Sequence, residues 1–361
     1  MIGKIFNIHG ITLSLETSQE ELFGATLAKL NDFYSYFSAN TKPRTTADIR
    51  IVLTKKIPRP QSRIEKLWTS TPGLFFHRGT ISYNDYCIFF KKGGSSFSIV
   101  GLSSKKTSLE ANITQLKPLK QLSLFLLAEK MLERGSLFVH AGGVSMGNSG
   151  IIVPAWGHAG KTALSLHLVN RGYKYFGDDK IIVSKDAKML SFPTSLQMFG
   201  YDFAACGFLG QSFSSGRPSY GRFVELPISS ILTDSQIGRV ADISQAFLIR
   251  RSPNGYSRII EEKNREIMIR KIVSITLNEF SYIYLLHNVL VVYCSSRSEL
   301  MQHIYNKIMS KACHDMENHV FWVPDRKIPP AAKISEMMDR FIEDYGISTD
   351  ILRVPPERCE L

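Results

Sequence analysis

The sequence lacks three features that would each define a large class of proteins. Its five cysteines are scattered and odd in number, so they predict no disulfide framework. No apolar run is long enough to cross a membrane, and residues 1–16 lack the continuous apolar core of a signal peptide. Internal repeats and low-complexity tracts are also absent. We therefore expect a cytoplasmic globular protein that has no membrane partner.

The charge of the chain limits its partners more than its fold. Of the 361 residues, 44 are basic and 32 are acidic, which gives a net charge of +12. This charge suits an acidic substrate, a nucleotide or a nucleic acid. The basic stretch from Arg44 to Lys66 has few aromatic residues, which is typical of a solvated loop rather than a nucleic-acid groove. We do not expect nucleic acid as the partner, although the net charge leaves it open.

The pattern of apolar residues divides the chain into three units. Residues 1–128 predict a small α+β domain, with a strand over 4–15, a helix over 19–37 and a strand over 48–53. Residues 129–325 predict the main domain. Residues 326–361 predict a linker and a helix with one apolar face, which would dock on its own core or on a neighbouring subunit. A homo-oligomer is therefore left open.

The main domain is organised around the stretch from Pro154 to Asp179. An apolar run over 151–153 predicts a buried strand, and a glycine-bearing loop follows it. A helical pattern comes next and ends at Gly172, after which a short strand over 173–176 leads to the pair Asp178 and Asp179. Strand, loop, helix, strand and acid pair is the layout of a P-loop nucleotide site.

The loop has the residue types that bind a triphosphate. Backbone N–H groups at the start of a helix attract phosphate, and Gly157 and Gly160 let the backbone approach it closely. Lys161 would reach the β- and γ-phosphates, and the Thr162 hydroxyl would bind Mg²⁺. The predicted nucleotide-binding residues are Ala155, Trp156, Gly157, His158, Ala159, Gly160, Lys161, Thr162, Ala163 and Arg222.

The loop departs from the usual motif at its first position. The motif G-x-x-x-x-G-K-[ST] has glycine where this chain has Ala155. An added Cβ is costly there only if the residue needs a positive φ. The alternative interpretation is an ordinary turn from strand to helix that happens to end in Gly-Lys-Thr.

The acid pair supplies the remaining chemistry. One carboxylate would hold the metal and the other would deprotonate a substrate hydroxyl. The sequence does not separate these roles; we take Thr162 and Asp179 as the metal ligands. Because neighbouring side chains on a strand point to opposite faces, the pair must lie on an irregular turn if both face the site, and Gly177 favours such a turn.

Two further segments are candidates for the site. His140 follows three apolar residues at a strand end, which by itself is typical of a hydrogen-bonded core histidine. Residues 200–220 are rich in glycine, serine and aromatic residues, which predicts either a lid or a disordered insert, and Arg222 follows the segment. Further on, strands over 246–251 and 256–260 predict a hairpin around Pro253, Asn254 and Gly255.

Residues 135–179 resemble the C-terminal domain of the HPr kinase/phosphorylase family, which is related to ATP-dependent phosphoenolpyruvate carboxykinase. The matching pieces are LFVHAGGV, MGNSG, the GKT loop, Arg171-Gly172 and the Asp-Asp pair. The resemblance implies an α/β fold with a P-loop kinase core and a mixed sheet, plus a smaller N-terminal α+β domain. It also implies that Lys161 and Thr162 contact ATP and Mg²⁺, and that His140 is an active-site histidine.

The function expected from these features is phosphoryl transfer. The protein would be an ATP- and Mg²⁺-dependent kinase whose acceptor is a hydroxyl, on a protein or peptide serine or on a small molecule. Asp178, Asp179, His140 and Lys161 would be its catalytic residues. Two alternatives remain: a P-loop hydrolase or nucleotide switch, in which the acids position water, and a non-catalytic nucleotide-binding module.

Overall fold

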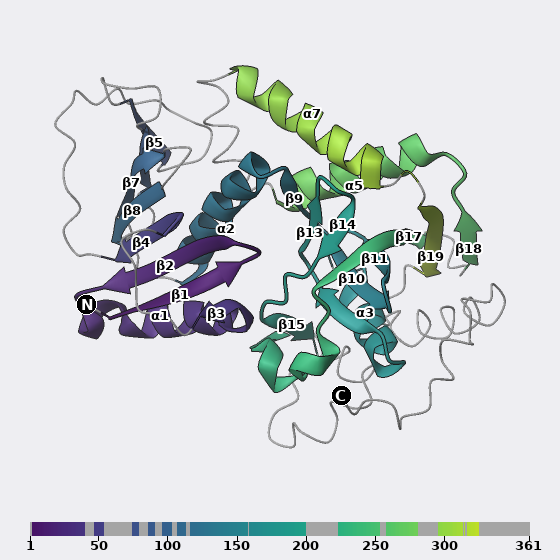
Figure 1. Cartoon of the computed structure of the whole chain (residues 1–361), viewed down its shortest axis with the longest axis horizontal. Helices are drawn as coiled ribbons and strands as arrows, with labels where there is room; N and C mark the ends of the chain where they lie inside the picture. Colours follow the sequence, from purple (N-terminus) through teal and green to yellow (C-terminus); the bar gives the residue numbers. More distant parts are fainter. Residues whose placement is uncertain are drawn as a thin grey trace.

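Two β-sheets with a long helix between them form the frame of the protein in the computed structural model (Figure 1). The helix, α2, contacts β2 and β4 of one sheet and β9 of the other. The fold is therefore mixed α/β, as the sequence predicts. The structure describes residues 2–39, 47–53, 74–78, 86–90, 96–102, 107–112, 116–157, 159–199, 223–252, 258–280, 295–312, 314 and 316–324.

The helices and strands have the following residue bounds, in the order of the chain. The N-terminal elements are β1 Ile2–Ile8, β2 Ile11–Thr17, α1 Glu20–Phe33, β3 Ser38–Ala39, β4 Ile49–Leu53, β5 Leu74–Arg78, β6 Tyr86–Phe90, β7 Ser96–Leu102, β8 Thr107–Asn112 and α2 Leu116–Glu133. The later elements are β9 Ser136–Val139, β10 Ala141–Met146, β11 Ser149–Pro154, α3 Lys161–Asn170, β12 Lys174–Gly177, β13 Ile181–Ser184, β14 Lys188–Leu190, β15 Leu196–Phe199, β16 Phe223–Leu226, β17 Val240–Ser252, β18 Arg258–Glu261, α5 Arg265–Glu279, α7 Ser295–Ala312 and β19 Glu317–Pro324.

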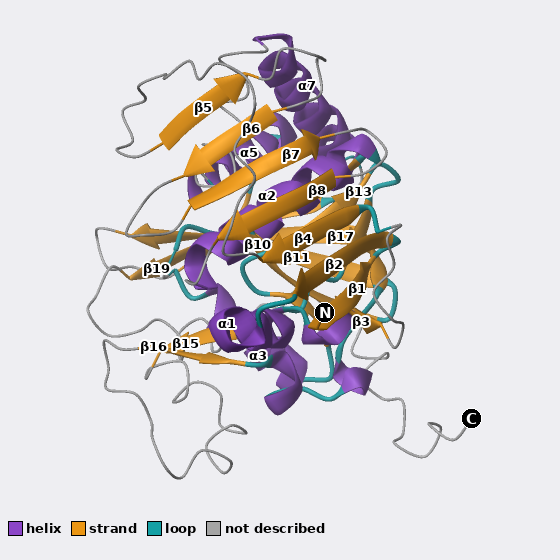
Figure 2. Cartoon of the chain, turned by 90° about the vertical axis from the view of Figure 1, so that its left-hand side faces the viewer, coloured by secondary structure: helices purple, strands orange, loops and turns teal. Residues whose placement is uncertain are grey.

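The first sheet has six strands in the order β3-β1-β2-β4-β8-β7, and Figure 2 shows the last five of these side by side. The pairs β2–β4 and β4–β8 are parallel, and the other pairs are antiparallel. The single strand expected over 4–15 is a hairpin of β1 and β2 instead. His9 and Gly10 form its turn with φ of 48° and 85°. The turn shifts the alternation by one residue, because Phe6 and Ile8 are buried before it and Ile11 and Leu13 after it.

The second sheet has nine strands and carries the predicted site. Seven of them run in the order β12-β10-β11-β17-β14-β13-β9, and β19 pairs with both β17 and β18. The expected hairpin around Pro253 is therefore wrong. Strands β17 and β18 do not pair; β19 lies between them, parallel to β17 and antiparallel to β18. The segment over 253–257 lies outside the described residues.

An aromatic cluster joins the two sheets into one core. Phe192, in the second unit, packs against Phe37 of the N-terminal unit at 5.4 Å and against Phe138 of β9 at 4.8 Å between ring centroids. His9 also bonds the Ser191 carbonyl, with 2.6 Å between Nε2 and the oxygen. Helix α2 continues without a break through residues 128 and 129, where the sequence suggests a domain boundary.

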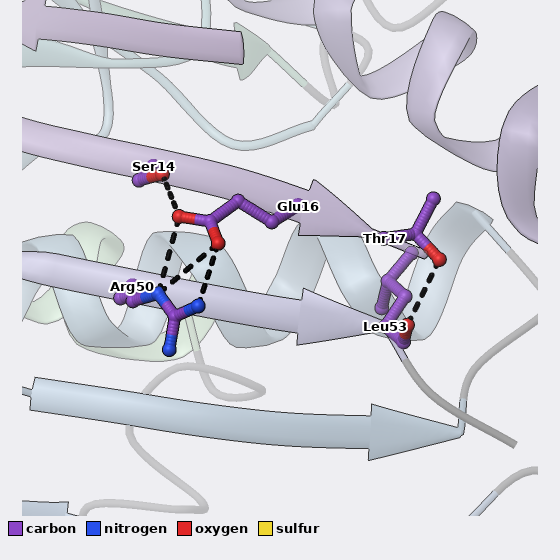
Figure 3. Close-up of polar contacts among 5 residues, drawn as sticks. All are labelled: Ser14, Glu16, Thr17, Arg50 and Leu53. Atoms are coloured by element: carbon purple, nitrogen blue, oxygen red, sulfur yellow. Dashed lines mark hydrogen bonds and ion pairs between the residues drawn. The ribbon is translucent and has the colours of Figure 1, made fainter. Parts of the chain in front are cut away.

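A partly buried ion pair links β2 to β4 in the first sheet (Figure 3). Arg50 Nη2 donates to Glu16 Oε2 at 2.7 Å, and the Ser14 hydroxyl donates to Glu16 Oε1 at 2.6 Å. Burial by itself raises the pKa of Glu16, but hydrogen bonds from Arg50 and Ser14 and the charge of Arg50 outweigh it and leave that pKa lowered. The carboxylate therefore stabilises the fold in its ionised form.

Replacing Arg50 with methionine should lower the free energy of unfolding at pH 7 by about 2 kcal/mol, because a buried carboxylate loses its donors. The lowered pKa of Glu16 means that its contribution is present above the ordinary glutamate pKa and is lost as pH falls through the folded value. Urea unfolding at decreasing pH should show the two proteins converging. Arg270→Met is the control, because Arg270 and its partner Glu266 are 75% and 72% exposed. A constant difference at every pH would contradict the assignment.

Candidate functional site

The loop before α3 has the conformation that its glycine predicts. Strand β11 continues into Ala155, which is buried and forms an isolated parallel bridge with Ile249 of β17. Gly160 ends the loop in the left-handed region at φ 104°, and its carbonyl accepts the first helical bond, from the Leu164 N–H at 3.1 Å. Ala155 is not among the described residues with positive φ, so alanine replaces the glycine of the motif there without backbone strain.

Lys161 is the first residue of α3 and is 4% exposed. Its Nζ donates to the carbonyl oxygens of Ala155 at 3.2 Å and Trp156 at 3.3 Å. The same Nζ lies 3.8 Å from Asp179 Oδ1. The ammonium therefore lies between the loop and the acid pair, where it can interact with both.

The acid pair follows the end of β12 on a tight turn, as the sequence predicts. A Cβ on Gly177 would lie 2.2 Å from the Lys180 carbonyl oxygen, so only glycine fits at this position. Asp178 is 9% exposed, and its Oδ2 accepts the Thr162 hydroxyl at 2.7 Å. The side chain of Asp179 is 50% exposed and faces Lys161. The turn thus sends one carboxylate inward to Thr162 and leaves the other accessible.

His140 lies between β9 and β10 and is 5% exposed. Its backbone N–H donates to the Thr276 hydroxyl of α5 at 3.1 Å, and its ring meets the Phe280 ring edge-on at 5.3 Å. The imidazole also lies close enough to Lys161 and Asp179 for their charges to act on its pKa. These contacts place His140 beside the acid pair, as expected of an active-site histidine, and also bury it, as expected of a core histidine.

His140 should stay neutral through the physiological range. Burial, followed by the charges of Lys161 and Lys180, lowers its pKa to about 3, although Asp179 opposes the change. The unfolded chain takes up this proton near pH 6.5, so His140 destabilises the fold as pH falls from there towards the folded value. We expect the NMR signals of its ring, assigned with His140→Gln, to stay constant from pH 8 to about pH 5. A titration midpoint near 6.5 would contradict this environment.

Several residues of the site give no signal in the sequence. Thr276, Glu279 and Phe280 come from the end of α5, more than a hundred residues after the loop. Phe280 packs against His140 and lies under the Lys180 ammonium, with 5.6 Å between Nζ and the ring centroid. No local motif could identify these residues, because the fold alone brings α5 to the loop.

Lys120 extends the charged region towards the N-terminal unit. It forms an ion pair with Glu225 of β16, whose carboxylate also accepts the Ser195 hydroxyl. The charges of Lys180 and Asp179 act on the pKa of Lys120, which burial lowers most. Helix α2 therefore lies within electrostatic range of the acid pair.

The structure brings most of the predicted residues together and leaves others undescribed. Lys161, Thr162, Asp178, Asp179 and His140 lie within one region, while Trp156 is exposed and Ala159 and Ala163 are buried. His158, Arg222 and the lid expected over 200–220 lie outside the described residues.

Comparisons with known proteins leave the chain without an assigned family. No family model matches it, and no curated protein does. The Hpr(Ser) kinase/phosphatase from Coxiella burnetii is a similar solved structure, with 9% sequence identity and a TM-score of 0.29 over 58% of this chain and 97% of that one. This similarity is distant, and its score carries no argument about fold or function. In the described part of the chain, no helix has the length and apolarity to span a membrane.

Proposed function

We propose that the protein is a kinase that transfers the γ-phosphoryl group of ATP to a hydroxyl group. One observation carries the proposal: the two residues that begin α3 each meet one member of the acid pair. Thr162 bonds Asp178 at 2.7 Å, and Lys161 lies 3.8 Å from Asp179. An ordinary turn from strand to helix gives no reason for a buried lysine and two adjacent carboxylates to converge. Phosphoryl transfer needs a cation, a metal ligand and a base at one place.

Thr162 and Asp178 fit a Mg²⁺ ion. A hydroxyl and a carboxylate oxygen 2.7 Å apart offer two hard oxygen ligands at one point, and Mg²⁺ is commonly bound by one or two carboxylates plus phosphates. When bound, Mg²⁺ would neutralise charge on the β- and γ-phosphates. This pairing leads us to assign the metal to Asp178 with Thr162, where the sequence suggested Asp179 with Thr162.

Asp179 then takes the role of the base. Its side chain is half exposed, so an acceptor can reach it, and the Lys161 ammonium lies 3.8 Å from its Oδ1. The acceptor hydroxyl would give its proton to Asp179 as its oxygen forms a bond to the γ-phosphorus. The bond from that phosphorus to the bridging oxygen breaks, and ADP leaves with the electron pair. Lys161 and the loop N–H groups would stabilise the charge on the phosphates.

Neutral His140 would help to position Asp179 and would not itself act as the general base. Its ring lies beside the Asp179 backbone and against Phe280. An imidazole that stays neutral adds no positive charge to the site, so Lys161 would be the cation that faces Asp179. We assign His140 to positioning the turn that carries the acid pair.

The proposal is tested in two measurements. Calorimetry with Mg²⁺ and ATP tests the nucleotide site, and its failure would favour an ordinary turn. Transfer of labelled γ-phosphate from ATP into fractionated lysate then tests the kinase and identifies the acceptor. ADP release that is independent of any acceptor would favour a hydrolase, and binding without turnover would favour a non-catalytic module.

A further inference from the structure

A carboxylate of α5 occupies the loop that precedes α3. Glu279 is the last residue of α5, and its Oε1 accepts the Gly157 N–H at 2.7 Å across 122 positions of sequence. A Cβ on Gly157 would lie 3.4 Å from Oε1 and 4.0 Å from Cδ of the same side chain. The carboxylate therefore lies directly against the glycine backbone.

Glu279 is poorly placed for the stability of its own helix. The carbonyl groups at the end of a helix carry partial negative charge, which disfavours an acidic residue there. The last turn of α5 has no basic residue to offset this charge. The helix end is held in place by the buried residues Ile272, Ile275 and Thr276. The contact with Gly157 is thus a favourable interaction that offsets the unfavourable position of this carboxylate.

The Lys161 ammonium also has its hydrogen-bond acceptors within the chain. Its ammonium donates to the Ala155 and Trp156 carbonyls and lies near Asp179. Two donors that the proposed function assigns to phosphate oxygens, the Gly157 N–H and the Lys161 ammonium, are therefore occupied by oxygen atoms of the protein. Of these oxygens, only those of Glu279 and Asp179 are charged, and only Glu279 bonds a loop N–H.

We propose that Glu279 competes with the nucleotide phosphates for the Gly157 N–H and thereby sets the affinity of the site. This inference rests on the proposed function, because it needs a site that binds a nucleoside triphosphate. One N–H cannot bond two anions at full strength, and a carboxylate next to a phosphate adds repulsion. Binding therefore requires the Glu279 side chain to leave the loop. While Glu279 accepts the Gly157 N–H, this donor is satisfied by the chain itself, and a weak ligand does not displace the carboxylate.

The test compares the affinity for Mg²⁺ and ATP of the full chain with that of Glu279→Ala and Glu279→Gln. Removing a charged hydrogen-bond competitor should tighten binding by about tenfold in Glu279→Ala. Glu279→Gln should show a smaller gain, because its amide oxygen can still accept the N–H but carries no charge. The matched control is Glu266→Gln, which removes the same charge from the exposed start of the same helix.

The outcomes separate this inference from the function on which it rests. Equal or weaker binding by both Glu279 variants, in a wild-type protein that binds ATP, would overturn the competitor role and leave the nucleotide site standing. An equal gain in Glu266→Gln would reduce the effect to net charge and overturn it as well. If neither wild type nor variant binds ATP, both the site and the inference are wrong. Thermal unfolding without ligand identifies any variant that fails to fold, and the second substitution then decides.

Discussion

Replacing Lys161 with methionine should weaken the binding of Mg²⁺ and ATP by about ten- to a hundredfold. A hydrogen bond to a charged partner is worth about 1.5–3 kcal/mol, and every 1.4 kcal/mol changes the affinity tenfold. Methionine is the better substitution because Lys161 is 4% exposed, and alanine would leave a gap in a buried place. Either change also removes the donor of the Ala155 and Trp156 carbonyls. Calorimetry with Mg²⁺ and ATP measures the effect directly.

The control for this experiment is Lys185→Met, which removes an equal charge from the exposed turn between β13 and β14. It should bind ATP as the wild type does, because it lies at a different turn of the sheet. Far-ultraviolet circular dichroism and thermal unfolding establish that both variants fold. If folded Lys161→Met binds ATP with unchanged affinity, the loop before α3 is not a phosphate site.

The parts of the fold that the sequence predicts well are those with local signals. The helix after the loop begins behind Gly160 and ends before Gly172, whose φ of 91° is the left-handed end that a glycine permits. The buried strand predicted over 151–153 is β11. In each case the period of the apolar residues and the glycine at the boundary lie within one short window.

The predictions that failed depended on pairing between distant segments. Two runs rich in β-branched residues around Pro253, Asn254 and Gly255 look like a hairpin, and nothing near them shows that β19 lies between them. Strand β19 comes from 317–324 and pairs in parallel with β17, which no turn signal can announce. The turn at His9 and Gly10 is different, because its signal is local: the buried positions change from Phe6 and Ile8 to Ile11 and Leu13, and a single strand over 4–15 does not allow for that shift.

The residues of the candidate site also fall into two groups, those with a local sequence signal and those that only the tertiary fold brings to the site. Lys161, Thr162 and the acid pair lie within one contiguous stretch, so a motif can find them. Glu279 and Phe280 reach the loop and His140 only through the packing of α5. The sequence also could not assign separate roles to the two aspartates, because adjacent residues share the same local pattern. Their difference arises in the tertiary structure, where Thr162 bonds one and Lys161 faces the other.

That difference leads to the second large effect, in which the two aspartates are expected to fail in different ways. Asp178→Asn keeps an oxygen that can accept the Thr162 hydroxyl but removes the charge that would hold Mg²⁺. Asp179→Asn keeps the shape of the turn and removes the base. Both variants should lose transfer to the true acceptor, by about 10²–10⁴-fold for the loss of a general base. Only Asp178→Asn should also weaken the affinity for ATP in the presence of Mg²⁺.

Measuring ATP affinity with and without Mg²⁺ tests whether Asp178 or Asp179 binds the metal. Wild type and Asp179→Asn should bind more tightly when Mg²⁺ is added, while Asp178→Asn should gain little from it. Asp186→Asn is the control, because Asp186 lies on an exposed turn and is 68% exposed. If Asp179→Asn, rather than Asp178→Asn, loses the response to Mg²⁺, the metal belongs to Asp179, as the sequence first suggested. If both variants keep wild-type turnover, neither carboxylate takes part in the reaction, and a non-catalytic nucleotide-binding module becomes the better description. Two adjacent carboxylates repel each other, and a metal and a transferred proton are the physical reason we give for placing them together.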